Sequence, residues 1–519
     1  MSSKPLLLVL LPAVFVVPSS ISGTAIALPH IAENLGADSA LLAWVVNAFN
    51  LCFACFTLIW GALSDRFDVR ACFVAGVALY LVGSLLSSFA PALLWLDIAR
   101  ACAGVGGASV FACGSALLRQ SFEAESRARA FALFGTTAGL GITFGPTISG
   151  ILIDFISWRA IFLFHSFILA LVLCFAAKGF YTYSKNKLGI SSFTKPHSSI
   201  PTHKQRISRS FDSKGALLFV AFMLSLMQLI MNLHALKEPK TLSITTLCLC
   251  LFCCFVLQQK RLSIKYANCQ DNAIPQPFLD VAVLKNTAFL GFSLVTVVAG
   301  FSFVVLLTYF PSFLSAIFGF SAFQTGAFML ALTTPMLFCP LVAARLINKG
   351  MDSKKFALAI SLVMSLGIFL LLFILYFLSG WIQMGMIAFV LFIIGCGMGL
   401  HAGAIDGLAL SKVESSKAGL AAGVLNSFRL GSEAIGVALY AALCVAFLNL
   451  YAFAHFVGYD IDFIHSFISI VSSGNLSSLE DRLYHHALSF YKQATFISLW
   501  VLGALCLFLS LIIGLLLRK

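Results

Sequence analysis

The stretch GALSDRFDVR, at residues 61–70, separates two long apolar runs of the chain. The run before it covers residues 40–61 and the run after it covers residues 71–90. At about 1.5 Å per residue, roughly 20 apolar residues in a helix cross the hydrocarbon core of a bilayer. The stretch therefore predicts a short polar loop between two antiparallel membrane-spanning helices.

The same alternation of long apolar runs and polar breaks continues along the 519 residues, of which 60% are hydrophobic and 10% are charged. Soluble domains carry roughly 25% charged residues, so this composition excludes an ordinary soluble protein. We interpret the first run, after Lys4, as a retained span because it is longer than the apolar core of a signal peptide. The sequence predicts an all-α polytopic membrane protein with fourteen spans, at residues 5–28, 40–61, 71–90, 94–118, 129–154, 159–178, 215–236, 241–258, 287–311, 322–345, 356–378, 383–411, 418–448 and 493–516.

Lys and Arg residues are distributed unevenly between alternate loops. An even number of spans puts both ends on one side, and short cytoplasmic loops carry an excess of positive charge. With the N-terminus inside, most Lys and Arg residues fall in cytoplasmic segments, so we expect both termini to be cytoplasmic. This also accounts for the net charge of +13 without a nucleic-acid partner. The exceptions are Arg159, Lys237, Lys240, Arg482 and Lys492 in external segments, and Arg100 and Arg429 within spans.

Two polar linkers divide the spans into six, two and six. A weak internal repeat supports two related halves, because GALSDR follows the second span and ARLINK, at residues 344–349, follows the tenth. Duplicated halves with a binding site between them are a common transporter plan. The predicted parts are an N-terminal six-helix bundle (1–178), a basic cytoplasmic loop (179–214), two additional spans (215–258), a cytoplasmic linker (259–286) and a C-terminal six-helix bundle (287–519) with an external loop (449–492).

The fifteen cysteines do not suggest a disulfide framework, because most lie within apolar runs, where Cys behaves as a small apolar residue. Cys250 and Cys253 have C-x-x-C spacing, but no further metal ligand is adjacent. We interpret His485 and His486 as ordinary loop residues. The sequence predicts no metal site and no cofactor.

The loop at residues 61–70 resembles the G-x-L-a-D-r-x-G-r-r motif that the major facilitator superfamily carries between its second and third spans. The resemblance implies the major facilitator fold of two six-helix bundles, here with two additional helices between them. It also implies a conformational latch whose acid pairs with a charge or a helix end of the other half. The alternative is a simple turn with positive-inside charges, and Asp68 replaces the usual second glycine. The latch residues are Gly61, Asp65, Arg66 and Arg70.

The fourth span contains RACAGVGGA at residues 100–108, which resembles the superfamily motif R-x-x-q-G-x-g-g-a. An arginine inside a span is costly and indicates a function. In the family this arginine is linked to proton coupling, which Arg100 and its neighbour Asp97, at i−3, are then expected to serve. The alternative is a purely structural ion pair between these two residues.

The fifth span contains GPTISG at residues 145–150, which resembles the antiporter signature G-P-x-x-G-G. Gly145, Pro146 and Gly150 allow a helix to bend and to approach its neighbour closely. In the family this signature accompanies exporters, so the resemblance implies efflux. The alternative is the general enrichment of glycine in membrane helices. SWRAIF (157–162) and AGLAAG (418–423) further resemble the sixth and thirteenth spans of the fourteen-span drug:proton antiporter family.

The chain departs from that family in its first span, where Ser20 stands at the position of the usual Asp. Glu433, near the middle of the thirteenth span, is a candidate substitute, and Arg429 lies four residues earlier on the same helix face. Glu433 is either the proton-coupling acid or half of a structural ion pair. His165 is a second titratable candidate, with helix packing as the alternative.

His401 and Asp406 are expected near the cytoplasmic end of the twelfth span. They are candidates for an exit path, with an ordinary role at a helix interface as the default interpretation.

Together these features predict an alternating-access transporter that exports hydrophobic or amphiphilic small molecules against protons. Its partners would be this cargo, protons and the lipid bilayer, and we expect a monomer in the plasma or bacterial inner membrane. A facilitator or importer of one metabolite and a non-transporting sensor on the same scaffold are the alternatives. No pattern of an enzyme active site is present. The expected cargo contacts near the midplane are Ser20, Thr24, Asn47 and Asn50, with His165 beside them.

Overall fold

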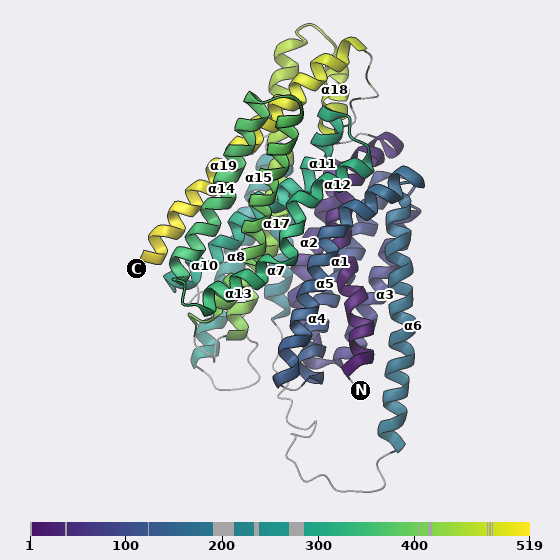
Figure 1. Cartoon of the computed structure of the whole chain (residues 1–519), viewed down its shortest axis with the longest axis vertical. Helices are drawn as coiled ribbons and strands as arrows, with labels where there is room; N and C mark the ends of the chain where they lie inside the picture. Colours follow the sequence, from purple (N-terminus) through teal and green to yellow (C-terminus); the bar gives the residue numbers. More distant parts are fainter. Residues whose placement is uncertain are drawn as a thin grey trace.

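The computed structural model describes residues 3–36, 39–122, 124–189, 212–232, 238–268, 285–402, 404–413, 418–474, 476, 479 and 481–518. Within these ranges the chain is helical and has no strand, which confirms the all-α fold (Figure 1). The helices are α1 (Ser3–Leu35), α2 (Ser39–Arg66), α3 (Val69–Ser88), α4 (Leu93–Ser121), α5 (Ala124–Phe155), α6 (Arg159–Gly189), α7 (Ser213–Met231), α8 (Pro239–Asn268), α10 (Thr287–Ala299), η3 (Gly300–Val304), α11 (Val305–Phe318), α12 (Ala322–Thr333), η4 (Thr334–Leu337), α13 (Cys339–Asn348), α14 (Ser353–Phe377), α15 (Gly380–His401), α16 (Ala404–Leu410), α17 (Ala418–His455), α18 (Ile461–Ser473) and α19 (Asp481–Arg518).

The helices supply 14 segments long and apolar enough to cross a membrane, as predicted. Three of these spans are interrupted. The π-helical turn η3 separates α10 from α11, and the 3-10 turn η4, which contains Pro335, separates α12 from α13. Pro has no N–H for the helix ladder, which explains the interruption at η4. The third interruption lies between α15 and α16.

Helices α1–α6 pack mainly on one another, and we refer to them as the N-half. Helices α10–α17 with α19 form the C-half, and the pair α7 and α8 packs beside it, with α7 against both α2 and α17. The domain limits proposed from the sequence fall partly at residues 190–211 and 269–284, outside the described residues, and stay predictions. Helix α18 lies within the expected external loop. The end of α17 and the start of α19 also fall within this loop.

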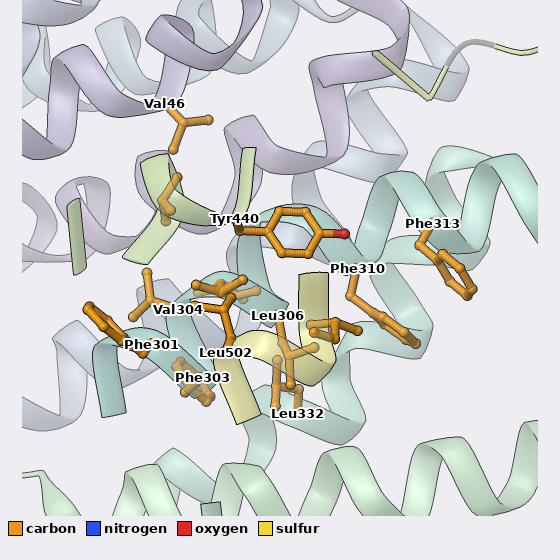
Figure 2. Close-up of a cluster of buried hydrophobic side chains, with 14 of the residues drawn as sticks. Val46, Phe301, Phe303, Val304, Leu306, Phe310, Phe313, Leu332, Tyr440 and Leu502 are labelled. Carbon is orange, nitrogen blue, oxygen red and sulfur yellow. The ribbon is translucent and has the colours of Figure 1, made fainter. Parts of the chain in front are cut away.

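The apolar core is shared between the two halves at one end of the molecule. The end that carries α18 is called the α18 end, and both termini lie away from it (Figure 1). One buried cluster joins the C-half to residues of α1, α2, α4 and α6 that lie towards the α18 end. Figure 2 shows Val46 of α2, Leu306 of α11 and Tyr440 of α17 within this cluster. The remaining core of the N-half forms a second cluster of its own, joined by Leu430 of α17. The two halves are therefore packed together most extensively at the α18 end.

Candidate functional site

The predicted latch lies where α2 ends and α3 begins. Asp65 and Arg66 belong to the last turn of α2, but their side chains lie outside the described part of the structure. Asp68, which replaces the family's glycine, is the N-cap of α3, and its carboxylate accepts a hydrogen bond from the Arg70 N–H at 3.2 Å. The substitution therefore serves helix capping. The latch itself stays a prediction.

Arg100 is buried inside the N-half and is only 1% exposed. Its Nη1 donates to Ser20 Oγ at 2.8 Å and its Nε donates to the Val45 carbonyl at 3.1 Å. The guanidinium lies 4.4 Å from the ring centroid of Phe49 and 5.5 Å from that of Phe162. Neutral oxygens and aromatic faces thus contact this cation directly, and the buried Asp97 interacts with it electrostatically. The side chain that replaces the family's first-span acid is its direct partner.

The other polar candidates of the N-half differ in whether they have hydrogen-bond partners. The Thr24 hydroxyl donates to the Ser20 carbonyl at 2.6 Å, so it is satisfied within its own helix. Asn47 is 1% exposed, and neither its amide oxygen nor its amide nitrogen has a hydrogen-bond partner among the described residues. The amide nitrogen of Asn50 also has no partner there. His165 Nε2 lies 3.5 Å from Ser19 Oγ. The structure brings Ser20 and Arg100 into contact and leaves two asparagine amides with unused hydrogen-bonding capacity.

The antiporter-like signature of α5 lies directly in the contacts with α1 and α12. A Cβ at Gly145 would meet Ser19 and Ser22 of α1, and a Cβ at Gly150 would meet the backbone of Ala322 at the start of α12. Gly326 of α12 lies against the backbone of Pro146 in the same way. Gly150 and Gly326 therefore allow backbone-to-backbone approach between the halves, and Gly145 allows close packing of α5 on α1 within the N-half. We call this contact between α5 and α12 the α5–α12 seam.

Hydrogen bonds run along the α5–α12 seam. The Thr143 hydroxyl donates to the Thr333 carbonyl at 3.0 Å, and the Thr333 hydroxyl donates back to the Thr143 carbonyl at 3.3 Å. The Thr147 hydroxyl donates to the Gly326 carbonyl at 3.1 Å. The seam is therefore specified by polar contacts as well as by the small residues.

Asp154, which sequence reasoning did not single out, closes the α18 end of this seam. The N–H groups of Ala322 and Phe323 donate to its two carboxylate oxygens at 3.2 and 3.0 Å. The first N–H groups of a helix have no partner within the helix, and its N-terminus favours negative charge. Asp154 thus binds the first two N–H groups of a helix of the other half, beside the helix's own N-cap Ser321. This contact is hard to predict from the sequence because the two N–H groups lie 168 and 169 residues away along the chain.

The charged candidates of the C-half lie on α15, α16 and α17. Arg429 Nη1 forms a salt bridge with Asp406 Oδ2 at 2.9 Å. The structure thus gives Arg429 a partner on α16, in addition to the predicted neighbour Glu433, whose half-buried side chain lies four residues further along α17. His401 is buried at the end of α15. Which of these groups couples protons stays a prediction.

Across the described residues, no three His, Cys, Asp or Glu side chains come together in an arrangement that could hold a metal ion. The arrangement of the site is that of membrane helices carrying a few buried ionisable and amide groups. Such groups inside a membrane protein typically line the paths of a substrate or an ion.

Comparison with solved structures supports this fold. The chain superposes on a bacterial homologue of the human lysosomal transporter Spinster, in an inward-facing and occupied conformation, with a TM-score of 0.61 and 14% identity, over 100% of this chain and 98% of that one. It superposes on the peptide transporter POT in complex with sulfate with a TM-score of 0.60 and 14% identity, over 99% and 95%. These likenesses show the fold.

Sequence relatives point to the same class of protein. The chain is 26% identical to the multidrug resistance protein Stp of Mycobacterium tuberculosis (strain CDC 1551 / Oshkosh) over 434 residues, which cover 82% of this chain and 72% of the relative. It is 27% identical to the uncharacterized MFS-type transporter YvkA of Bacillus subtilis (strain 168), over 84% of this chain and 89% of the relative. Residues 10–437 match the family model described as Major Facilitator Superfamily. The chain therefore belongs to the Major Facilitator Superfamily and is a membrane transporter of small molecules with fourteen spans.

Proposed function

We propose that this transporter exports hydrophobic or amphiphilic small molecules by alternating access, in exchange for protons. The observation that carries the proposal is the α5–α12 seam, in which the antiporter-like residues Pro146 and Gly150 contact α12, while Gly145 of the same signature contacts α1. Relatives named multidrug resistance proteins support the same direction of transport.

We infer that both termini are cytoplasmic and that the α18 end is external. The positive-inside distribution of Lys and Arg supports this orientation. In this orientation the two halves are packed together on the external side. A monomer in the plasma or bacterial inner membrane is part of the proposal.

The proposed coupling groups are Glu433 in the C-half and Arg100 in the N-half. Glu433 is the acid placed to bind and release a proton inside the membrane, and Arg429 is its charged neighbour. Arg100 with Asp97 and His165 forms the corresponding polar group of the N-half. The cargo would contact Ser20, Thr24, Asn47 and Asn50, of which the two asparagines keep unpaired amide atoms in the described structure.

Transport by purified protein in proteoliposomes tests this proposal. Ethidium serves as a cationic probe and chloramphenicol as a neutral probe. An inward proton gradient should drive either probe out of the compartment that corresponds to the cytoplasm. If the gradient moves neither of them, proton-driven export is contradicted.

Glu433→Gln tests the coupling group. This variant should lose gradient-driven export but keep probe exchange at equal pH, because exchange needs no net proton movement. The matched control is Glu33→Gln, which changes an exposed carboxylate near the end of α1. Unchanged gradient-driven export in Glu433→Gln would exclude Glu433 from coupling.

A facilitator or importer of one metabolite is the second candidate. Ser20 beside Arg100 favours it, because the middle of the first span then offers no carboxylate for a cation or a proton. Uptake of a metabolite that is independent of an imposed pH gradient would support this alternative over export.

A further inference from the structure

A buried histidine ends α15 at the third interruption of the membrane spans. Gly380–Leu410 is one apolar span of 31 residues, yet α15 ends at His401 and α16 begins at Ala404. His401 is 1% exposed, and neither of its ring nitrogens has a hydrogen-bond partner among the described residues. A buried polar group without a partner costs free energy, so such a group is retained where it has a use.

An ion pair lies beside this histidine. Asp406 of α16 binds Arg429 of α17 through Oδ2, while its Oδ1 is buried and makes no hydrogen bond within the described structure. Asp406 and Arg429 are the two charged groups that interact electrostatically with His401. Burial of the ring and the nearby arginine disfavour a protonated imidazole, whereas the acid and the C-terminal end of α15 favour it.

The elements packed against α15 bring few other titratable groups. Helices α10 and α12 and the turns η3 and η4 carry none in their described residues. The remaining groups are Cys339 and Arg345 on α13, Lys354, Lys355 and Tyr376 on α14, and Cys396 on α15 itself. The interaction of His401 with Asp406 and Arg429 is therefore the main electrostatic feature of this break.

A groove runs along the same break. Its volume is about 420 Å³, and it is lined by Ala402, Ala404 and Gly407 on one side and by Pro340 and Ala344 of α13 on the other. This volume is large enough for several water molecules. Ala402 is the residue next to His401, so the buried imidazole and the groove lie on adjacent residues of the chain.

We propose that His401 and Asp406 form a proton-transfer site at the break between α15 and α16, which connects the C-half interior to water in the groove. This inference rests on the proposed proton-coupled export. In the transfer step, a ring nitrogen of protonated His401 gives its proton to a groove water and the imidazole becomes neutral. Asp406 stabilises the cation before release. Arg429 links this site to Glu433, because it lies one turn from Glu433 on α17 and binds Asp406. Broken helices at ion pathways are a recurring feature of transporters.

Nuclear magnetic resonance tests the site without any cargo. Protein with 15N-labelled histidine is placed in nanodiscs, and the signal lost in His401→Gln belongs to His401. We expect this signal to change between about pH 4 and pH 8, where histidines exchange protons with water. In Asp406→Asn the pH dependence of this signal should differ from that of the wild type, because the negative charge beside His401 is gone. A His401 signal that is constant over this range in both proteins would overturn the inference.

Transport provides the second arm. His401→Gln and His401→Phe should each lower gradient-driven ethidium export on the order of 10²-fold, a usual loss for a positioned proton-transfer group, while ethidium binding stays as in the wild type. Using two variants separates a proton role from failed folding, which a gel-filtration profile reports. The control is His465→Gln, which changes an exposed histidine on α18.

The two proposals fail in different ways. Wild-type export that continues unchanged in both His401 variants would overturn the proton-transfer site and leave the export function standing. A His401 that titrates from the water side in a protein without gradient-driven export would support the site and contradict the export function.

Discussion

Asp154 of α5 and Ala322 of α12 connect the two halves of the transporter through a helix cap. The carboxylate of Asp154 accepts the Ala322 N–H at 3.2 Å and the following N–H of Phe323 at 3.0 Å. A helix N-terminus of one half is thus satisfied by an acid of the other. Any motion that separates the halves at the α18 end has to break this cap.

Asp154→Ala should weaken the closed state of the α18 end. Ser321 stays as the N-cap of α12, and the variant removes hydrogen bonds to a charged acceptor of the other half. A loss of about 1 kcal/mol corresponds to roughly a fivefold change in the population of the open state. Hydrogen–deuterium exchange at the first turn of α12 should increase.

The matched control for Asp154→Ala is Asp352→Ala, because Asp352 caps α14 by accepting the Lys354 N–H within the same half. This control should raise exchange only at the start of α14. Equal exchange at α12 in Asp154→Ala and wild type would refute a role of the cap in holding the halves together.

Gly150→Ala should impair transport, because its Cβ would collide with the backbone of Ala322 across the α5–α12 seam. Backbone atoms cannot yield as a flexible side chain does, so the halves would be forced apart there. Gly135→Ala is the control on the same helix, since a Cβ at Gly135 meets no atom within 4 Å. We expect a clear loss of proteoliposome transport in the first variant and wild-type rates in the second. Similar rates in both would argue against close packing at the seam.

Ser20→Ala should destabilise the N-half. It removes the oxygen that accepts the hydrogen bond of Arg100 Nη1 at 2.8 Å, which leaves a buried charged donor unsatisfied. The expected cost is about 1–3 kcal/mol, measured as a lower midpoint of thermal unfolding in detergent. Ser22→Ala is the control, because the Ser22 hydroxyl donates only to the Pro18 carbonyl of its own helix. An equal decrease of the unfolding midpoint in both variants would show that the contact with Arg100 adds no stability beyond that of a hydrogen bond within one helix.

Asn47→Leu should raise stability while it lowers transport. The buried amide of Asn47 has no hydrogen-bond partner within the described structure, so an apolar side chain of similar size removes a desolvation cost of about 1–3 kcal/mol. If the amide serves cargo, affinity falls at the same time. Asn449→Leu is the control, because its amide already donates to the Val445 carbonyl at 2.8 Å. A lower unfolding midpoint in Asn47→Leu would contradict an unsatisfied amide.

The spans could be predicted from the sequence because hydropathy acts locally and each span satisfies its own backbone. The positions of Arg100 and Gly150 inside spans followed from the same local pattern. The contact partners of such residues on other helices could not be predicted from this local pattern. Helix periodicity predicts Glu433 as a neighbour of Arg429, and the two interact electrostatically, but periodicity does not indicate the salt bridge from Arg429 to Asp406 on α16. Asp154 and Ser20 find their partners on other helices, and helix periodicity carries no information about such contacts.

The glycines of the α5–α12 seam have a mechanical consequence. At Gly150 and Gly326 the two halves meet through main-chain atoms, so no side chains interlock across these positions. Rolling of one half on the other therefore requires no change of rotamer there. Along the seam, the resistance to this motion comes from a small number of hydrogen bonds, made by Asp154, Thr143, Thr147 and Thr333. Single substitutions among these four residues should tune how fast the transporter cycles without rebuilding its core.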